Sequence, residues 1–263
     1  MAESIYCEQQ GAIATLTINR PAKHNALSPD MLELCCTHLA RLQAEAQTRV
    51  LVIRGQGTRA FTSGFDIGRL PERQGQAPET QGAGPSLFAH FIAQVRAFPA
   101  PTLAMIHGYC MGGGLELAAT CDIRLAADTG QFRMPPARLG VLYSAEGLLR
   151  FVNLIGIAYT SEIFLTACTF DAARARDMGL LNHVLPPDEL EPTTYAMARQ
   201  IAENAPLSVQ YTKRVLGLIH SFQDVSAHAA TMQHLRDICM QSADLQEGRR
   251  AFLDKRPPVF QGR

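Results

Sequence analysis

The chain has 263 residues, 47% of them hydrophobic, which is enough for one sizeable core or for a large domain with a small appendage. The 24 basic and 24 acidic side chains balance, so no general electrostatic field draws in nucleic acid or an anionic membrane. Any anionic ligand must therefore be held by local groups.

Short hydrophobic patterns predict an α/β core. Four apolar runs are predicted to be strands. They cover residues 13–18, 50–53, 102–106 and 123–126. A polar loop follows the first run, and a helix then begins with Ser28 at the N-cap and Pro29 at the first helical position. Strands that alternate with helices in this way are typical of α/β proteins.

The composition changes twice further along the chain. Between residues 70 and 86 Pro, Glu, Gln and Gly prevail, which predicts a surface loop. From about Asn182 onward only helical patterns occur, and the stretch is rich in charge. We therefore predict a core over residues 1–186 and a small C-terminal helical domain over residues 187–263.

The cysteines and the N-terminus indicate where the protein works. Seven scattered cysteines include no CxxC pair and no metal-ligand spacing, so we expect reduced thiols and no metal site. The N-terminus lacks the pattern of a signal peptide, and no uncharged apolar run is long enough to span a bilayer. These features predict a soluble, cytoplasmic protein.

Two segments carry the candidate chemistry, residues 59–67 and residues 107–118. In the second segment a strand ends and Gly112, Gly113 and Gly114 open a helix. Glycine lets a ligand approach the backbone, and a helix N-terminus offers unpaired N–H groups. A phosphate-binding loop is the competing interpretation, but neither a following Lys-Ser/Thr nor the GxGxxG spacing is present. Alone, such a triplet more often marks tight packing than a site.

Together the two segments resemble the signature regions of the crotonase superfamily, the enoyl-CoA hydratase/isomerase family. The resemblance extends to residues 25–27, 171–184 and 247–256, in the family's order and spacing. It implies a spiral of ββα units followed by a helical domain that assembles trimers, often paired into hexamers. It also implies an acyl-CoA substrate and no separate cofactor, because coenzyme A is part of the substrate.

The resemblance assigns roles to individual residues. It places an oxyanion hole at the backbone N–H groups of Phe65 and Gly113, and a catalytic carboxylate at Glu116. Two donors aimed at the thioester oxygen would stabilise negative charge as it develops. The implied coenzyme A contacts are Lys23, Ala26, Leu27, Asp66 and Ile67, with Phe252 and Lys255 supplied by a neighbouring subunit.

The chain departs from the hydratase pattern at Pro136, where those enzymes carry a second glutamate. Hydration needs one group to activate water and another to manage the proton at C2. Glu146 is a candidate for the missing carboxylate, although an acid in the first turn of a helix more often only complements the helix dipole. The run around Pro136 and Tyr143 most resembles the methylmalonyl-CoA decarboxylase branch, in which Tyr143 would orient a departing carboxylate.

We therefore expect decarboxylation of a methylmalonyl-CoA-like substrate through an enolate. Three alternatives stay open at this point. Enoyl-CoA hydration in fatty-acid metabolism would need a second acid such as Glu146 beside Glu116, whereas Δ3–Δ2 isomerisation would need only one of them as a base. A non-catalytic acyl-CoA-binding protein would explain Pro136 but not the presence of Gly113 and Glu116. Thioester hydrolysis would need a nucleophile or a positioned water that the sequence does not identify.

Overall fold

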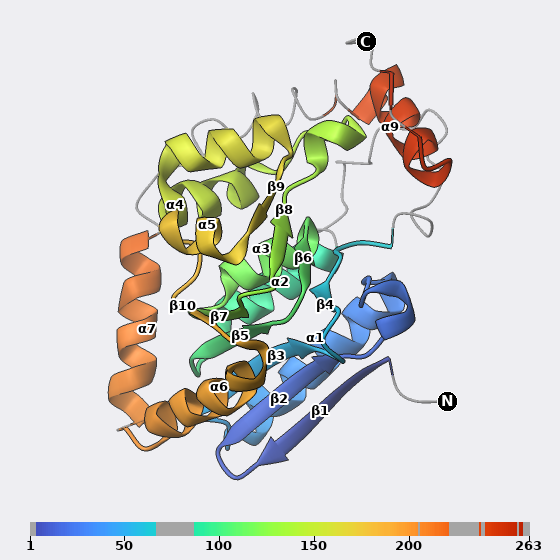
Figure 1. The fold of residues 1–263 in the computed structure, drawn as a ribbon. Coiled ribbons are helices and arrows are strands. Elements are labelled where there is room, and N and C mark those ends of the chain that lie inside the picture. Colours follow the sequence, from blue (N-terminus) through green and yellow to red (C-terminus); the bar gives the residue numbers. More distant parts are fainter. Residues whose placement is uncertain are drawn as a thin grey trace.

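The computed structural model describes residues 4–66, 87–204, 206–220, 237, 240–256 and 258–259. Two β-sheets and the helices around them form an α/β body (Figure 1). The larger sheet has the strand order β1 (Ile5–Gln10), β2 (Ile13–Ile18), β3 (Val50–Gly55), β5 (Thr102–Ile106), β7 (Ile123–Ala127) and β10 (His183–Leu185). The smaller sheet has the order β4 (Ala60–Thr62), β6 (Tyr109–Met111), β8 (Gln131–Arg133) and β9 (Thr169–Asp171).

The described helices connect and cover the sheets. They are α1 (Pro29–Glu45), α2 (Leu87–Ala97), α3 (Gly113–Thr120), α4 (Ala145–Thr166), α5 (Ala172–Asp177), α6 (Pro187–Ala202), α7 (Pro206–His220) and α9 (Ala243–Leu253), with the 3-10 turns η1 (Pro21–Lys23) and η3 (Pro136–Leu139).

Three consecutive units share one design. The strand pairs β3/β4, β5/β6 and β7/β8 each send their first strand to the larger sheet and their second strand to the smaller one, and a helix follows. Within each sheet these strands run parallel to one another. The predicted spiral of ββα units is therefore confirmed.

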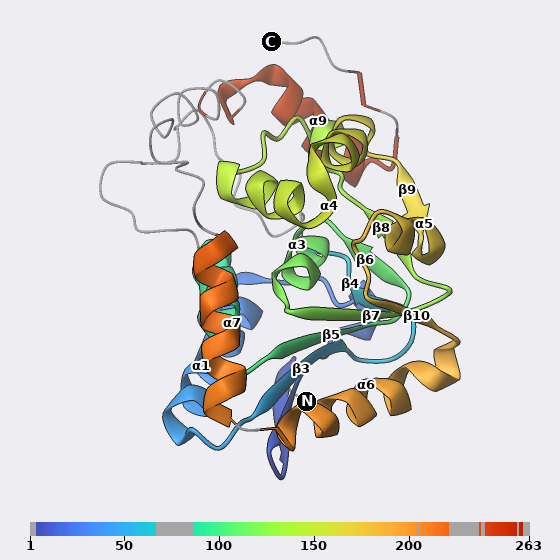
Figure 2. The same ribbon diagram turned by 90° about the vertical axis from the view of Figure 1, so that its left-hand side faces the viewer.

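Side chains of the larger sheet alternate between two hydrophobic cores. In β3, Leu51 and Ile53 face the core beneath α1 to α4, whereas Val50 and Val52 face α6. Figure 2 shows this layering, with α6 on one side of the sheet and α3 and α4 on the other. Because both faces are buried, the strand is a continuous apolar run rather than an alternating one.

The predicted strands and the first helix agree with the structure to within two residues at their ends. Ser28 is the N-cap of α1, but its side chain makes no capping hydrogen bond. The predicted loop over residues 70–86 lies outside the described residues. The expectation of helices only beyond Asn182 was wrong, because β10 adds three residues to the larger sheet, parallel to β7.

Helix α6 belongs to the stretch predicted as a separate helical domain, yet its buried Leu190, Thr194 and Ala198 face the larger sheet. The boundary at residue 186 stays a prediction. Helix α4 is, among the described helices, the one long and apolar enough to cross a membrane. However, Gly156 interrupts it with φ 75° and ψ 165°, and the helix packs on α3 and η3.

Candidate active site

The two segments singled out in the sequence meet where β4 ends and α3 begins. Strands β4 and β6 are parallel neighbours, so their carboxyl ends lie at the same edge of the smaller sheet. Gly64 has φ +84°, and a Cβ there would lie 2.8 Å from the Met111 carbonyl oxygen and 3.0 Å from the Gly113 nitrogen. A Cβ on Gly114 would lie 2.5 Å from the Thr62 carbonyl oxygen. Only glycine permits this close approach.

The Phe65 and Gly113 amides are left available by the surrounding hydrogen bonds. Leu27 donates its N–H to Gly64 at 2.8 Å, and Asp66 donates its N–H to Leu27 at 2.9 Å. This parallel bridge turns the intervening Phe65 N–H away from Leu27. Gly113 is the first residue of α3, where an N–H has no partner within the helix. Within the described residues, neither amide donates to a backbone carbonyl outside a helix or strand.

Two aromatic rings cover the Gly113 backbone. The Phe65 and Phe88 rings meet edge to face, with centroids 4.5 Å apart. A Cβ on Gly113 would lie 3.1 Å from Cε2 of Phe65 and 3.3 Å from Cζ of Phe88. Both side chains are only partly buried. The candidate oxyanion donors therefore have an aromatic wall directly beside them.

Glu116 lies one turn into α3 and is buried with two partners. The Tyr143 hydroxyl donates a hydrogen bond to Oε2 of Glu116. On the other side, Nε of Arg150 lies 3.9 Å from Oε1 of Glu116. The side chains of Arg150 and Glu116 are 13% and 9% exposed. The three residues form a cluster that brings α3, α4 and the segment before α4 together.

Burial shifts the proton affinities in this cluster. Desolvation raises the pKa of Glu116, whereas the Tyr143 hydrogen bond and the Arg150 charge oppose that shift. Desolvation and the neighbouring Glu116 carboxylate raise the pKa of Tyr143 well above its ordinary value, so the phenol keeps its proton. The cluster therefore holds one carboxyl group and one hydroxyl donor for proton transfer or substrate contact.

The two positions considered for a second carboxylate, 136 and 146, differ in their surroundings. Pro136 is buried as the first residue of η3 and brings no acid to the site. Glu146 lies exposed in the first turn of α4, where Ser144 accepts the N-cap hydrogen bond from Gly147 at 3.1 Å. The charge of Glu146 still raises the pKa of Glu116, so the two carboxyl groups interact electrostatically.

The predicted coenzyme A loop is held together by a residue that the sequence reading missed. Nη1 of Arg20 lies 2.7 Å from Oδ2 of Asp66 and 3.4 Å from the Ala26 carbonyl oxygen. This pair ties residues 20–27 to the segment after β4. Lys23 is exposed at the end of η1, whereas Ala26 and Leu27 are buried.

The remaining predicted contacts lie elsewhere. Ile67 lies outside the described residues. Phe252, 53% exposed at the end of α9, and Lys255, exposed just beyond it, face solvent in the single chain. In the part of the chain that the structure describes, no three His, Cys, Asp or Glu side chains gather as metal ligands.

Arg150 is the second residue that the sequence reading missed. The sequence does carry a signal for it, which is a single charge within the apolar run 147–152 of α4. A charged side chain in such a run is buried only when a partner is near. That partner, Glu116, comes from another helix, and so the pairing itself could not be read from the sequence.

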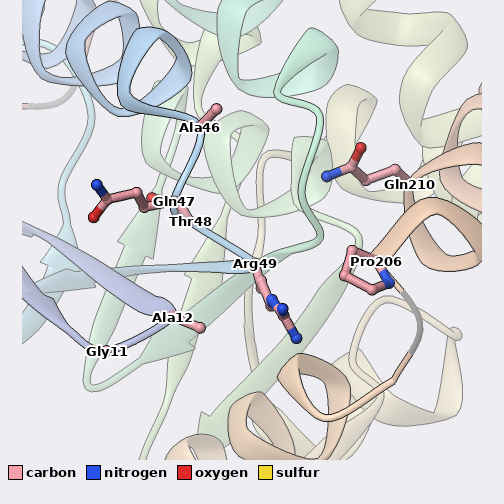
Figure 3. Close-up of a pocket in the computed structure, with 8 residues that line it drawn as sticks. All are labelled: Gly11, Ala12, Ala46, Gln47, Thr48, Arg49, Pro206 and Gln210. Carbon is pink, nitrogen blue, oxygen red and sulfur yellow. The ribbon is translucent and has the colours of Figure 1, made fainter.

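A hollow of about 460 Å³ shares no lining residue with the cluster of Glu116, Tyr143 and Arg150. Figure 3 shows its lining residues, which are Gly11, Ala12, Ala46, Gln47, Thr48, Arg49, Pro206 and Gln210. Ala46 is the C-cap of α1, whereas Leu27 and Ser28 precede the N-terminus of that helix. Its 17 residues separate the hollow from the predicted coenzyme A loop at Leu27 by roughly 25 Å. The hollow is therefore not part of the candidate active site.

Comparisons with known proteins agree on the family and differ on the reaction. The family model described as enoyl-CoA hydratase/isomerase matches residues 8–263. Methylmalonyl-CoA decarboxylase of Escherichia coli (strain K12) is 33% identical over 258 residues, 95% of each chain. The 2,3-dehydroadipyl-CoA hydratase of the same strain is 32% identical over 265 residues, 100% of each chain. A structure of methylmalonyl-CoA decarboxylase in complex with 2-nitronate-propionyl-CoA matches with a TM-score of 0.91 at 30% identity, covering 100% of both chains.

Proposed function

The chain belongs to the enoyl-CoA hydratase/isomerase family, and on this premise we propose that it decarboxylates a methylmalonyl-CoA-like thioester. One observation carries the proposal: the Tyr143 phenol, rather than a second carboxylate, donates a hydrogen bond to Glu116. The family resemblance, which assigns the second glutamate of the hydratases to the position of Pro136, supports the same reaction. The similarity to methylmalonyl-CoA decarboxylase supports the same reaction, and the similarity to a hydratase keeps the alternative open.

In the proposed reaction the Phe65 and Gly113 amides receive the thioester oxygen. The substrate carboxylate is held perpendicular to the thioester plane, and the C–C bond to it breaks. Its electrons pass into the thioester, carbon dioxide leaves, and the resulting enolate takes up one proton at C2. Each amide that is aimed at the developing oxyanion is worth about 3–4 kcal/mol of barrier. No base is needed for bond breaking, so one glutamate suffices.

Binding of the nucleotide part is proposed for the loop that Arg20 and Asp66 hold together. Lys23 would meet the phosphates, and Ala26, Leu27, Asp66 and Ile67 would line the adenosine and pantetheine path. Phe252 and Lys255 would reach a neighbouring subunit of a trimer or hexamer. Support for assembly comes from large apolar side chains that are exposed on α7 and α9. They are Tyr211, Val215, Leu216, Phe252 and Leu253.

Hydration or isomerisation of an enoyl-CoA is the second candidate. It is favoured by the electrostatic contact between Glu116 and Glu146, since a second carboxyl group is what hydration requires. Isomerisation would need only one of the two as a base.

A panel of three thioesters separates these reactions. Methylmalonyl-CoA, crotonyl-CoA and a 3-enoyl-CoA are incubated with the enzyme while carbon dioxide, hydration, isomerisation and free thiol are followed separately. We expect carbon dioxide and a saturated acyl-CoA from the first substrate and slow hydration of the second. Tyr143→Phe should slow decarboxylation, and Pro136→Glu should raise hydration alone. Hydration of crotonyl-CoA by the wild type at about 10 per second or more would overturn the proposal.

A further inference from the structure

In the proposed reaction the Tyr143 hydroxyl must donate to the substrate carboxylate, but in the structure it already donates to Glu116. A phenol has one O–H to donate. In the structure that O–H is already donated to Oε2 of Glu116. A substrate carboxylate can take it only if Glu116 gives it up. A buried carboxylate that loses its donor without replacement is destabilised by its own desolvation.

Arg150 offers the replacement donor. Its Nε is buried and, within the described residues, has no hydrogen-bond partner. Buried donors without a partner are rare in folded proteins, and each calls for an explanation. The nearest carboxylate oxygen, Oε1 of Glu116, lies 3.9 Å away. That is about 1 Å beyond a hydrogen bond, a distance that a small rotation of the Glu116 side chain covers.

We propose that Arg150 is a positioning residue that takes over the Glu116 carboxylate when the Tyr143 hydroxyl turns to the substrate carboxylate. Before binding, Tyr143 holds Oε2 and the Arg150 donor is unused. After binding, Arg150 holds Oε1 and the phenol points at the substrate. The number of hydrogen bonds to Glu116 stays the same in the two states, so the exchange leaves no buried carboxylate without a donor.

The charges around the cluster fit this exchange. Glu146, in the first turn of α4, adds negative charge near Glu116, and Arg96 of α2 adds positive charge near Arg150. A second carboxylate, that of the substrate, would repel Glu116 unless a cation stood beside it. Arg150 is the cation within 4.0 Å of Glu116 among the described residues. The Arg150 guanidinium lies near Oε1 of Glu116, whereas Tyr143 donates to Oε2. Because the two donors use different oxygens, one can bind the carboxylate as the other leaves it.

A double-mutant cycle on carbon dioxide release from methylmalonyl-CoA tests the exchange. Arg150→Met is expected to lower kcat/KM roughly 10- to 100-fold, the range for a hydrogen bond to a charged group, because the exchange accompanies substrate binding. In the Tyr143→Phe background the same substitution should change kcat/KM less than about twofold, because no hydroxyl is left to release. A purely structural role for Arg150 predicts the same loss in both backgrounds, and that result would overturn the proposal.

Arg54 provides the matched control. Its Nε is also buried without a partner in the described residues, and its Nη1 pairs with Glu191 at 3.1 Å. Arg54→Met should show no coupling to Tyr143→Phe. Should Arg150→Met fail to fold, Arg150→Lys carries the test, because it keeps the charge but lacks the Nε donor. It is expected to show the same coupling at a smaller size.

The inference rests on the proposed function, and a binding experiment separates the two. 2-Carboxypropyl-CoA carries a carboxylate but no thioester carbonyl, so it cannot be decarboxylated. Calorimetry should give a roughly tenfold weaker Kd for Arg150→Met when Tyr143 is present and no change when Tyr143→Phe is already in place. Coupled binding without carbon dioxide release by the wild type would leave the exchange standing and remove the proposed function. If the wild type releases carbon dioxide but the effects of Arg150→Met and Tyr143→Phe are additive, the proposed function stands and the exchange is overturned.

Discussion

Gly64→Ala tests the proposed oxyanion hole through the backbone, because its donors are amides that no side-chain truncation removes. The added Cβ would lie 2.8 Å from the Met111 carbonyl oxygen and 3.0 Å from the Gly113 nitrogen. Both neighbours are backbone atoms, so the Phe65 segment itself must move. The left-handed φ of +84° adds about 1–2 kcal/mol of strain for any residue with a Cβ.

The effect on activity should exceed the effect on stability. An active-site group must be held within about 0.5 Å of its productive position. Moving the Phe65 amide by more than that removes one oxyanion donor, which lowers kcat by about 10²–10³. The free energy of unfolding should fall by only about 1–3 kcal/mol, leaving the variant folded.

Gly57→Ala is the matched control for this experiment. Gly57 has φ +77°, but no atom lies within 4 Å of its Cβ position. It should lose about 1–2 kcal/mol of stability from strain alone and keep kcat within about twofold. The assays are urea unfolding and turnover of the best thioester for each variant. If Gly64→Ala turns over as fast as Gly57→Ala, the Phe65 amide has no part in catalysis.

Three further predictions concern specificity, stability and pH. Phe65→Ala opens the wall that Phe65 and Phe88 form beside Gly113. The ratio of kcat/KM for a thioester with a butyl group at C2 to that for a thioester with a methyl group at C2 should therefore rise at least about tenfold. An unchanged ratio would show that the two rings do not limit the size of the acyl group. Lys213→Met breaks the 2.7 Å pair with Asp122 that fastens α7 to the core, and should cost about 1–3 kcal/mol in urea unfolding and speed hydrogen exchange in α7. Because burial raises the pKa of Glu116, the stability that its proton supplies is present in acid and lost as the pH rises through that pKa. The stability of Glu116→Gln relative to the wild type should therefore rise as the pH increases above about 4, where an ordinary glutamate in the unfolded chain ionises.

The framework of the fold could be predicted because it depends on local patterns. Apolar runs such as 50–53 and 102–106 are continuous where a strand is buried on both faces, and the structure has strands at both positions. Strand β10 escaped prediction because three residues carry no periodic signal. It forms through pairing with β7, assisted by Asn182, whose Oδ1 accepts from the Arg124 N–H at 2.9 Å.

The site was predictable only in part, because some of its contacts are local in the sequence and others depend on how distant elements pack. Gly113 and Glu116 lie on one short helix, so their proximity follows from helical spacing. The contact between Glu116 and Tyr143 joins residues 27 positions apart and depends on how α3 and α4 pack. Arg20 and Arg150 act through partners on other elements, and contacts between elements cannot be predicted from the spacing of residues in the sequence.

We propose that the Phe65 and Gly113 amides favour an enolate over a ground-state thioester. The ligand 2-nitronate-propionyl-CoA mimics the enolate, since its reacting carbon is planar and its oxygens carry the negative charge. Calorimetry should find that it binds the wild type at least about 10²-fold more tightly than propionyl-CoA does. This preference should be largely lost in Gly64→Ala and retained in Gly57→Ala. Equal affinities of the two ligands for the wild type would contradict the claim.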